Sequence, residues 1–503
     1  MLGDPPAKSH SRGKMLSMRA MGQCFRRLLP LLLVMLHMVV QGQFTFTNLH
    51  NFGATYRDGY GPSSDLVLGS NTLYGTTASG GTNANGTIFK INTDGSGYRI
   101  IRSLTNSPVP EGGMVLISNT LYGTMFTGGS ANNGSIFKID TDGSVFTELY
   151  SFSTTGPSVL GTNSDGNRPQ GDLVRDSSTL YGTARYGGTN GNGTIFKINT
   201  QGSGFTVIKT FSATFLGTNN VSGNILASGT NTDGAMPNGG LVLDGSTLYG
   251  TTYHGGTSNG VVFAMQTDGS DYTVLKYFSR IDRQLGVGTN SDGAAPVAGL
   301  TLSGDTLYGV TVGGGAGACG NIFSMKTNGT AFTNLHDFAW YSDGGFPRST
   351  LFLDGSSLYG TTAAGGLSNK GTIFRVLTSG AHFTTLTNLN SSVGTQCDSR
   401  FVLSSNTLYG AAANGGSSGG GVLFGLTVLP QIMSDANFGN QSNAFGFDVI
   451  GISSQVVVVD GCTDLVSTNW LPLQTNTLTG GASYFSDPEW TNYAARLYRI
   501  RSP

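Results

Sequence analysis

Two sets of side chains in this sequence combine residue types that bind ligands. The first is a carboxylate that recurs in the motif Asp-Gly-x-x-Pro, where x is any residue. Several oxygen donors that converge can hold a cation such as calcium, or a hydroxyl-rich ligand. The local alternative, which we favour, is that Asp caps a turn and Pro ends it, so that each Asp→Asn change costs little stability. The five carboxylates are Asp58, Asp165, Asp233, Asp292 and Asp343.

The second set consists of polar and aromatic residues that stand at positions where the other repeats differ. These are Arg168, Arg185, Tyr186, Tyr253 and His254. An enzyme would gather such unrepeated side chains in one place, so their convergence is the structural question that the sequence raises. A lone histidine makes neither a metal site nor a proton relay. We therefore assign no catalytic residue and no set of metal ligands.

Both sets belong to a tandem repeat whose most regular element is the tripeptide Leu-Tyr-Gly. A Gly-Gly pair stands seven and eight residues after each Leu, and an apolar pair follows 15 residues after it, or 14 in the fourth copy. A fixed spacing of this kind indicates a repeat architecture. The seven copies begin at Leu73, Leu121, Leu180, Leu248, Leu307, Leu358 and Leu408.

Each copy predicts four antiparallel strands, which we call A to D. Strand A is an apolar triplet, strand B contains Leu-Tyr-Gly, strand C resembles Gly-Thr-Ile-Phe-Lys-Ile, and strand D is rich in Phe and Thr. Asp-Gly and related pairs supply the tight A–B and C–D turns. Nearly all variation in length falls between strand D and the next strand A, and these loops share one face with the glycine-rich B–C loops. Variable loops on a fixed scaffold usually carry binding, so this loop face is the candidate binding face.

The two ends of the repeat region predict a closed ring. Residues 44–52 match strand D, whereas the seventh copy ends after its strand C. The N-terminal strand can therefore complete the seventh sheet and leave no bare edge. The predicted fold is all-β: a seven-bladed β-propeller closed by the N-terminal strand, followed by a small C-terminal β module.

The pattern LYGTT…GG…GTIFKI…TDG…FT resembles the GloVer tandem-repeat family of exported bacterial proteins. The resemblance covers residues 44–428 and all seven copies, and the TDG turn varies at Gln201, Asn328 and Ser379. It implies a secreted or surface protein with an interchangeable C-terminal anchoring module. It brings no catalytic motif with it.

The ends of the chain predict export and a separate final domain. A basic segment, the apolar residues 28–40 and a small residue together form the pattern of a signal peptide over residues 1–42. Thirteen apolar residues are too few to span a bilayer, and no transmembrane segment follows. We predict a propeller over residues 43–429 and a β module over residues 430–503, which serves surface retention or caps the propeller. The expected location is extracellular or at the cell surface.

Composition and charge narrow the function further. A formal net charge of −1 argues against a dedicated nucleic-acid-binding protein. Charged residues make up only 11 %, which excludes a charge-rich disordered chain. Three cysteines remain after the signal peptide, too few for a disulfide framework, although one bridge stays open. They are Cys319, Cys397 and Cys462.

Three functions remain open after these exclusions. The leading hypothesis is a secreted, monomeric, non-catalytic module that binds a glycan or an extracellular protein. The second is a hydrolase or lyase whose site lies on the face of the D–A loops. The third is a structural component of the cell envelope. Calcium is the only cofactor that the sequence brings into question.

Overall fold

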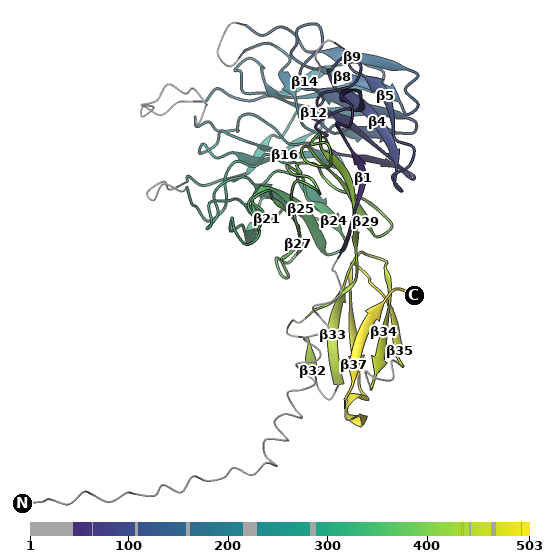
Figure 1. Ribbon diagram of the computed structural model, residues 1–503. Coiled ribbons are helices and arrows are strands. Elements are labelled where there is room, and N and C mark those ends of the chain that lie inside the picture. Colours follow the sequence, from purple (N-terminus) through teal and green to yellow (C-terminus); the bar gives the residue numbers. More distant parts are fainter. Residues whose placement is uncertain are drawn as a thin grey trace, which may run out of the picture. The chain divides into compact units, whose positions relative to one another are not determined.

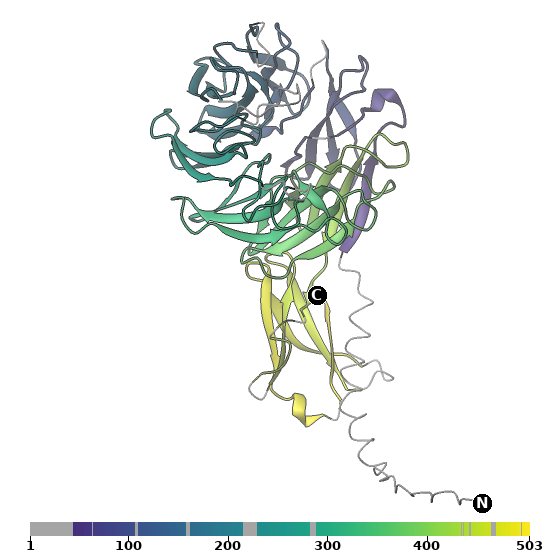
Figure 2. The ribbon, with the colours of Figure 1, turned by 90° about the vertical axis from the view of Figure 1, so that its left-hand side faces the viewer.

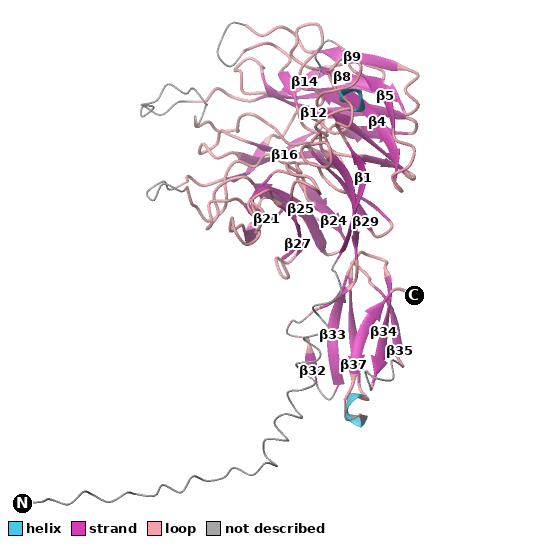
Figure 3. Cartoon of the chain, in the orientation of Figure 1, coloured by secondary structure: helices cyan, strands magenta, loops and turns pink. Residues whose placement is uncertain are grey.

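The computed structural model describes residues 44–503 except 63, 106–108, 157–160, 215–228, 282–287, 434, 436, 442–443, 464–468 and 494. The signal peptide predicted over residues 1–42 lies outside the described residues. The described chain divides into two compact units, residues 44–429 and 430–503 (Figure 1). Regular structure in this part of the chain is strand, apart from the short 3-10 helices η1 (Tyr56–Asp58) and η2 (Trp490–Asn492) (Figure 3). The all-β class predicted from the sequence is confirmed.

Residues 44–429 form seven antiparallel sheets within the described part of the chain, and each sheet has the strand order A, B, C, D. Strand A comprises β2 (Val67–Gly69), β6 (Val115–Ile117), β11 (Val174–Asp176), β15 (Val242–Asp244), β19 (Thr301–Ser303), β24 (Phe352–Asp354) and β28 (Val402–Ser404). Strand B comprises β3 (Thr72–Thr77), β7 (Thr120–Met125), β12 (Thr179–Tyr186), β16 (Thr247–Thr252), β20 (Thr306–Thr311), β25 (Ser357–Ala364) and β29 (Thr407–Ala412). Figure 2 shows the successive sheets in sequence colours from purple to green.

Strands C and D complete these sheets. Strand C comprises β4 (Thr87–Asn92), β8 (Ser135–Asp140), β13 (Thr194–Asn199), β17 (Val261–Gln266), β21 (Asn321–Lys326), β26 (Thr372–Leu377) and β30 (Val422–Val428). Strand D comprises β5 (Arg99–Ser103), β9 (Phe146–Ser151), β14 (Thr206–Thr210), β18 (Thr273–Tyr277), β22 (Thr333–Asp337), β27 (Thr384–Asn388) and β1 (Phe44–Asn51). The short strands β10 (Asn167–Pro169) and β23 (Gly345–Pro347) also pair with strand B of the third and sixth sheets.

The seventh sheet combines the first and the last strands of this unit. Its order is β1-β30-β29-β28, so β1 supplies the strand D that the seventh copy lacks. The pairing is antiparallel and runs from Phe44 opposite Val428 to Asn51 opposite Val422. Two segments more than 370 residues apart in sequence therefore share one hydrogen-bonded ladder.

The Leu-Tyr-Gly tripeptide joins each sheet to its two neighbours. In the first copy, Leu73 packs in a buried cluster with residues of the seventh sheet, whereas Tyr74 packs in a cluster with the second sheet. The glycine is required by the strand opposite, because a Cβ atom on Gly75 would lie 2.5 Å from Cζ of Phe89. Alternate side chains of strand B thus face opposite sides of the sheet, as the pleat dictates.

Buried apolar clusters join consecutive sheets from the first to the sixth, and the seventh to the first. The cluster between the seventh sheet and the first contains Phe52, Leu66, Phe89 and Tyr409. Full burial of one such side chain stabilises the fold by about 1.5–3 kcal/mol, so each interface contributes substantially.

A bulge in strand D recurs where strands C and D pair. The register shifts by one residue in each pair, as between Ile88 and Phe89 of strand C, opposite Ile101. The C–D turn of the next sheet lies against this bulge, and a Cβ atom on Gly143 would be 2.4 Å from the carbonyl oxygen of Ile101. The turn glycine therefore serves close approach between sheets as well as its φ of +84°.

The second unit, residues 430–503, contains two small sheets. One contains β31 (Gln431–Ile432), β32 (Gly439–Gln441), β33 (Ala444–Ile450) and β36 (Ala482–Asp487), and the other has the order β35 (Leu471–Thr477), β34 (Val456–Cys462) and β37 (Leu497–Arg501). Their shared core includes Phe447, Val459 and Phe485. The buried carboxylate of Asp460 accepts hydrogen bonds from the Nε atoms of Arg499 and Arg501, both at 2.9 Å. Across the described residues of both units, no disulfide joins Cys319, Cys397 or Cys462, and all three side chains are buried.

Candidate functional site

In each copy, three residues stand just before the apolar residue that leads into strand A. We call them pre-A positions 1, 2 and 3; in the third copy they are Gln170, Gly171 and Asp172. Position 2 is always small, whereas positions 1 and 3 differ from copy to copy. The described residues at position 1 are Glu111, Gln170, Asn238, Val297, Arg348 and Asp398. Those at position 3 are Asp65, Gly113, Asp172, Gly240, Gly299, Thr350 and Arg400.

Pre-A residues line a cavity of about 460 Å³. All seven copies contribute to its wall, and positions 1 and 3 supply most of its polar groups. Arg185 near the end of strand β12 also lines the cavity, as do the residues that directly follow strand B in three other copies, Ala78, Tyr253 and Val312. The cavity thus mixes carboxylates, guanidinium groups, amides and one aromatic hydroxyl, which is the composition of a site for a polar ligand.

The small residues at position 2 let neighbouring copies approach each other closely around the cavity. A Cβ atom on Gly171 would lie 2.5 Å from the carbonyl oxygen of Gly239, and one on Gly239 would lie 2.4 Å from the carbonyl carbon of Ala298. Each backbone contact therefore leaves no room for a side chain. This explains why position 2 repeats while its two neighbours vary.

Position 3 forms hydrogen bonds from one copy to the next. The backbone N–H of Arg400 donates to Oδ1 of Asp65 at 2.6 Å, and that of Gly113 donates to Oδ1 of Asp172 at 2.5 Å. The N–H of Gly299 donates to Oγ1 of Thr350 at 3.0 Å. These bonds fix the carboxylates of position 3 at the cavity wall.

Asp65 and Asp172 form a carboxyl pair in this wall. Burial raises the pKa of Asp65 well above its usual value, and the charge and hydrogen bond of Asp172 raise it further. A hydrogen bond between two carboxyl groups needs a proton on one of them, so the pair holds one proton when isolated carboxyls are ionised. The two carboxyl groups share this proton, and their remaining oxygen lone pairs can accept hydrogen bonds from a ligand.

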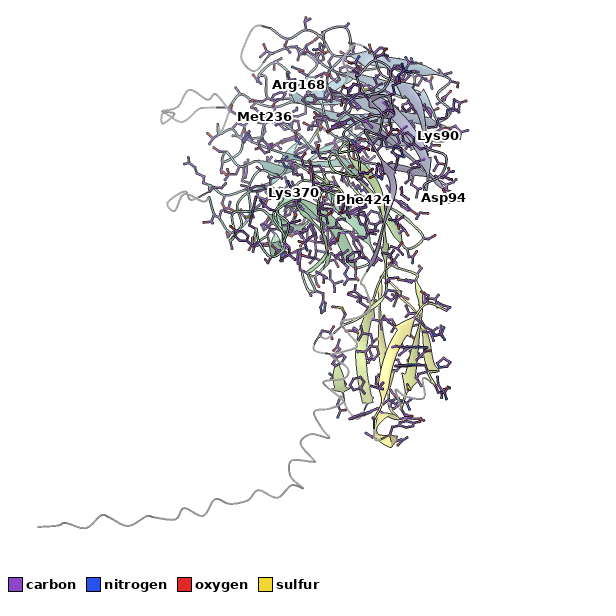
Figure 4. All side chains as sticks on the ribbon, in the orientation of Figure 1. Lys90, Asp94, Arg168, Met236, Lys370 and Phe424 are labelled. Atoms are coloured by element: carbon purple, nitrogen blue, oxygen red, sulfur yellow. The ribbon has the colours of Figure 1, made fainter. Side chains whose placement is uncertain are left out.

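The five unrepeated residues that the sequence singled out do converge. The guanidinium of Arg168 lies 5.2 Å from the ring of Phe126 and 5.8 Å from that of Tyr186. The guanidinium of Arg185 lies 5.2 Å from the ring of Tyr186 and 5.8 Å from that of Tyr253, and the ring of His254 is 4.1 Å from that of Tyr253. We call this set the Arg–Tyr stack: Phe126, Arg168, Tyr186, Arg185, Tyr253 and His254. Figure 4 labels Arg168 above and to the left of Asp94, which lies in a C–D turn.

The charges around the Arg–Tyr stack affect one another. Burial raises the pKa of Glu111, and the positive charges of Arg185 and Arg168 oppose this rise. Burial also lowers the pKa of His254, to which the charge of Arg185 adds, so that the imidazole is neutral at pH 7. The stack therefore has two cations that face one carboxylate.

Several polar atoms at the cavity are buried without a hydrogen-bond partner among the described residues. They are Oδ1 of Asn238, Oδ1 of Asp398 and Nε of Arg185. Arg185 uses another nitrogen, Nη1, to donate to Oε1 of Gln170 at 3.1 Å. Buried polar atoms are nearly always satisfied in folded proteins, so these three atoms have hydrogen-bonding capacity that the described residues leave unused.

The repeat identifies the family of this chain. A family model for the Gloeobacter/Verrucomicrobia repeat matches residues 35–230 and 284–445, more than half of the chain. The chain belongs to the Gloeobacter/Verrucomicrobia repeat family. This confirms the resemblance drawn from the Leu-Tyr-Gly pattern.

Other comparisons concern curated proteins and solved structures. No curated protein matches this member of the Gloeobacter/Verrucomicrobia repeat family. Among solved structures, oligogalacturonate lyase from Vibrio parahaemolyticus is 11 % identical, with a TM-score of 0.46 over 78 % of this chain and 95 % of that one. A chain of a nidogen/laminin complex is 16 % identical, with a TM-score of 0.33 over 56 % of this chain and 81 % of that one.

In this Gloeobacter/Verrucomicrobia repeat protein, the five Asp-Gly-x-x-Pro carboxylates do not converge. Each one binds a residue of the strand D that precedes its loop, and none of them lines the cavity. The bonded pairs are Asp58 with His50 at 3.2 Å, Asp165 with Tyr150 at 2.8 Å, Asp233 with Lys209 at 2.7 Å, Asp292 with Lys276 at 2.6 Å and Asp343 with His336 at 2.8 Å.

The strand D partner also contacts an aromatic ring of the next sheet. His50 stacks on Tyr98 at 3.7 Å between ring centroids, and the ammonium of Lys209 lies 4.2 Å from the ring of Tyr272. We call each Asp with its partner and this ring a strand-D cluster. The rings that complete the five clusters are Tyr98, Phe205, Tyr272, Phe332 and Phe383. The carboxylates thus tie a loop, its own sheet and the next sheet together.

The described residues hold neither a metal-ion cluster nor a membrane-spanning helix. No group of three or more His, Cys, Asp or Glu side chains is placed to hold a metal ion in this part of the chain. No helix among the same residues has the length and apolar character needed to cross a membrane.

Sequence reasoning missed the cavity residues of the pre-A segment. Asp65, Glu111, Asp172, Asn238 and Asp398 were not among the candidates, because they belong neither to the recurring Asp-Gly-x-x-Pro motif nor to the unrepeated Arg, Tyr and His residues. The signal in the sequence is variation rather than recurrence, because positions 1 and 3 differ between copies of a unit that otherwise repeats. That variation marks where each copy contributes something different to one shared surface.

Proposed function

We propose that residues 44–429 form a closed seven-bladed β-propeller that binds a glycan in its central cavity. The pairing of β1 with β30 supports the closure, as does the buried cluster between the seventh and first sheets. In such a ring, strand A of each sheet is innermost, and the pre-A residues of all copies meet at the axis. The proposed cavity is thus the mouth of the propeller channel.

The cavity itself is the observation that carries the proposal. Its volume of about 460 Å³ lies in the range of small-molecule sites. Carboxylates, amides and guanidinium groups suit the many hydroxyls of a sugar, because each can bond two of them. The ring of Tyr253 offers an apolar face against which a sugar ring can pack.

The small size of the cavity disfavours an extracellular protein, which is the other class of partner that the sequence left open. A stable protein–protein interface buries about 800 Å² on each partner, far more than this concave site offers. Export is part of the proposal and rests on the signal-peptide pattern of residues 1–42. We propose surface retention or capping for residues 430–503.

A blocking variant tests the proposal. The secreted protein is first screened on a glycan array, and the strongest hit is titrated by calorimetry. Val297→Trp should fill the cavity and weaken binding at least tenfold, because Val297 lines the wall. The matched control is Val145→Trp, at a side chain that is 51 % exposed and outside the cavity. A blank array, or equal affinities for the two variants, would refute the proposal.

A hydrolase acting in this cavity is the second candidate, and the Asp65–Asp172 pair favours it. In such a pair the ionised carboxylate takes a proton from water as the water oxygen bonds to the anomeric carbon. The protonated carboxyl donates its proton to the leaving oxygen as the glycosidic bond breaks. Prolonged incubation with the bound oligosaccharide would then release new reducing ends, and Asp172→Asn would stop their release. An intact oligosaccharide after this incubation would leave the protein a binding module.

A further inference from the structure

The Arg–Tyr stack breaks the symmetry of the repeat. The fifth residue after the Leu of Leu-Tyr-Gly is large and planar in the second, third and fourth copies: Phe126, Arg185 and Tyr253. In the remaining copies the same position is occupied by Ala78, Val312, Ala363 and Ala413. One side of the proposed channel mouth therefore carries a stack of flat groups, and the other side has only small aliphatic residues.

The stack leaves one positive charge without a neighbouring carboxylate. The guanidinium groups of Arg168 and Arg185 each lie within 5.8 Å of two aromatic rings, and Glu111 is the carboxyl group whose pKa both of them affect. The other acidic residues of the cavity have different partners: Asp65 bonds with Asp172, and Asp398 faces Arg348. The excess charge is thus local to this wall.

The geometry of Arg185 leaves part of its hydrogen-bonding edge for a ligand. Nη1 donates to Gln170, whereas Nε is buried and has no partner among the described residues. A guanidinium group can donate two parallel hydrogen bonds to one carboxylate. The ring of Tyr253 stands 5.8 Å from this guanidinium.

Building on the proposed glycan function, we propose that the ligand is an acidic sugar, whose carboxylate binds Arg185 while its ring packs on Tyr253. The hydroxyl groups of the same sugar then face the Asp65–Asp172 pair and Asn238, which can donate and accept hydrogen bonds. A uronic acid combines these groups in one ring: a single carboxylate, several hydroxyls and an apolar face. The cavity offers matching chemistry for all three.

A matched pair of sugars tests this inference directly. The probes are a disaccharide that ends in glucuronic acid and its counterpart that ends in glucose, which differ only in a carboxylate against a CH₂OH group. The wild-type protein should bind the uronate at least tenfold more tightly by calorimetry. This preference should shrink as salt rises, because part of it is electrostatic.

Variants that remove either the positive charge of Arg185 or the negative charge of Glu111 sharpen the test. Arg185→Gln should bring the preference for the uronate close to one, whereas Arg175→Gln, at an exposed arginine of β11, should leave it unchanged. Glu111→Gln removes the opposing carboxylate and should tighten uronate binding several-fold, a gain that a folding defect cannot imitate.

The possible results separate the two proposals. Equal affinity for the two sugars, or a uronate preference that survives Arg185→Gln, would overturn the acidic-sugar inference and leave glycan binding intact. A protein that binds neither sugar and nothing on the glycan array would overturn the proposed function together with this inference.

Discussion

The strand-D clusters and the cavity use the same types of residue in opposite ways. In the strand-D clusters, a carboxylate recurs in five copies and bonds a neighbour on the preceding strand, as Asp233 does with Lys209. At the cavity, carboxylates occupy positions that do not recur, as Asp65, Asp172 and Glu111 do. The strand-D clusters connect successive sheets in a similar way each time, whereas the cavity residues form one irregular site.

In a repeat protein, recurring and variable polar positions have different roles. A polar residue that returns in each copy meets the same neighbours each time, so it stabilises the unit. A polar position that differs between copies while its surroundings stay constant contributes to a surface that all copies share. In this chain the carboxylates of the Asp-Gly-x-x-Pro motif recur and join neighbouring sheets. The side chains that can bind a ligand lie at the variable pre-A positions.

The largest expected effect comes from removing β1, the strand that completes the seventh sheet. Deleting residues 44–52 removes β1 and buried Phe52 and leaves the seventh sheet with three strands. Loss of Phe52 alone should cost about 3–5 kcal/mol, and the bare edge of β30 should promote self-association. Thermal melting and light scattering would measure both effects.

The control for this deletion is the chain that begins at Phe44. A truncated protein that melts at the same temperature as this control and stays monomeric would contradict the assignment of β1 as the closing strand.

The next effect tests whether the strand-D clusters are structural alone. The turn interpretation favoured from the sequence predicts little cost for Asp→Asn, but the contacts in the structure correct this. Asp233→Asn should lower the free energy of unfolding by about 1–3 kcal/mol, because Lys209 and the N–H of Ser212 lose a charged acceptor. Asp268→Asn, in an exposed C–D turn, serves as the control and should leave the melting temperature unchanged. Calorimetry should give the same glycan affinity for both variants. A loss of affinity in Asp233→Asn would erase the distinction between the two regions.

A smaller effect concerns the pH dependence of the carboxyl pair. Because the pKa of Asp65 is raised in the folded state, its contribution to stability is complete below the ordinary value of 3.8 and is lost as pH rises through the folded value. The groups that face it are Asp172, Arg400 and the thiol of Cys397. Between the ordinary and the folded pKa, stability should fall by about 1.4 kcal/mol for each pH unit.

Asp65→Asn removes this titration and keeps the hydrogen bonds. Above pH 4, the wild-type protein should therefore lose stability relative to Asp65→Asn as the pH increases, as measured by chemical denaturation. Parallel stability curves for the two proteins between pH 4 and pH 8 would show that Asp65 is not held in its protonated form.

The smallest expected effect is that of calcium. Since the five motif carboxylates each bind their own strand D partner, millimolar calcium or a chelator should not change the melting temperature. A calcium-dependent rise would mean that these carboxylates bind an ion together, and it would place function in the strand-D clusters.

The sequence predicted the strands well because their causes are local. Turn residues such as Asp-Gly and the alternation of Leu and Tyr in strand B act over a few residues, and the unpaired strand D at residues 44–52 identified its own partner, β30. The convergence of Arg168, Arg185, Tyr186, Tyr253 and His254 was raised as a question by their lack of repetition.

The carboxyl pair and the strand-D clusters could not be predicted in the same way. Asp65 and Asp172 lie in different copies, and their contact depends on how closely the small residues at position 2 bring those copies together. The bond from Asp58 to His50 depends on the path of a loop whose length varies between copies. Such contacts arise from the packing of whole sheets, which no local pattern encodes.

The position of a bound sugar tests the central claim most directly. A crystal structure of residues 44–503 with the acidic oligosaccharide should show the sugar inside the cavity, with its carboxylate on the guanidinium of Arg185 and its ring against Tyr253. A sugar bound at the strand-D clusters, or anywhere outside the pre-A segment and the Arg–Tyr stack, would contradict the assignment of function to the variable positions of the repeat.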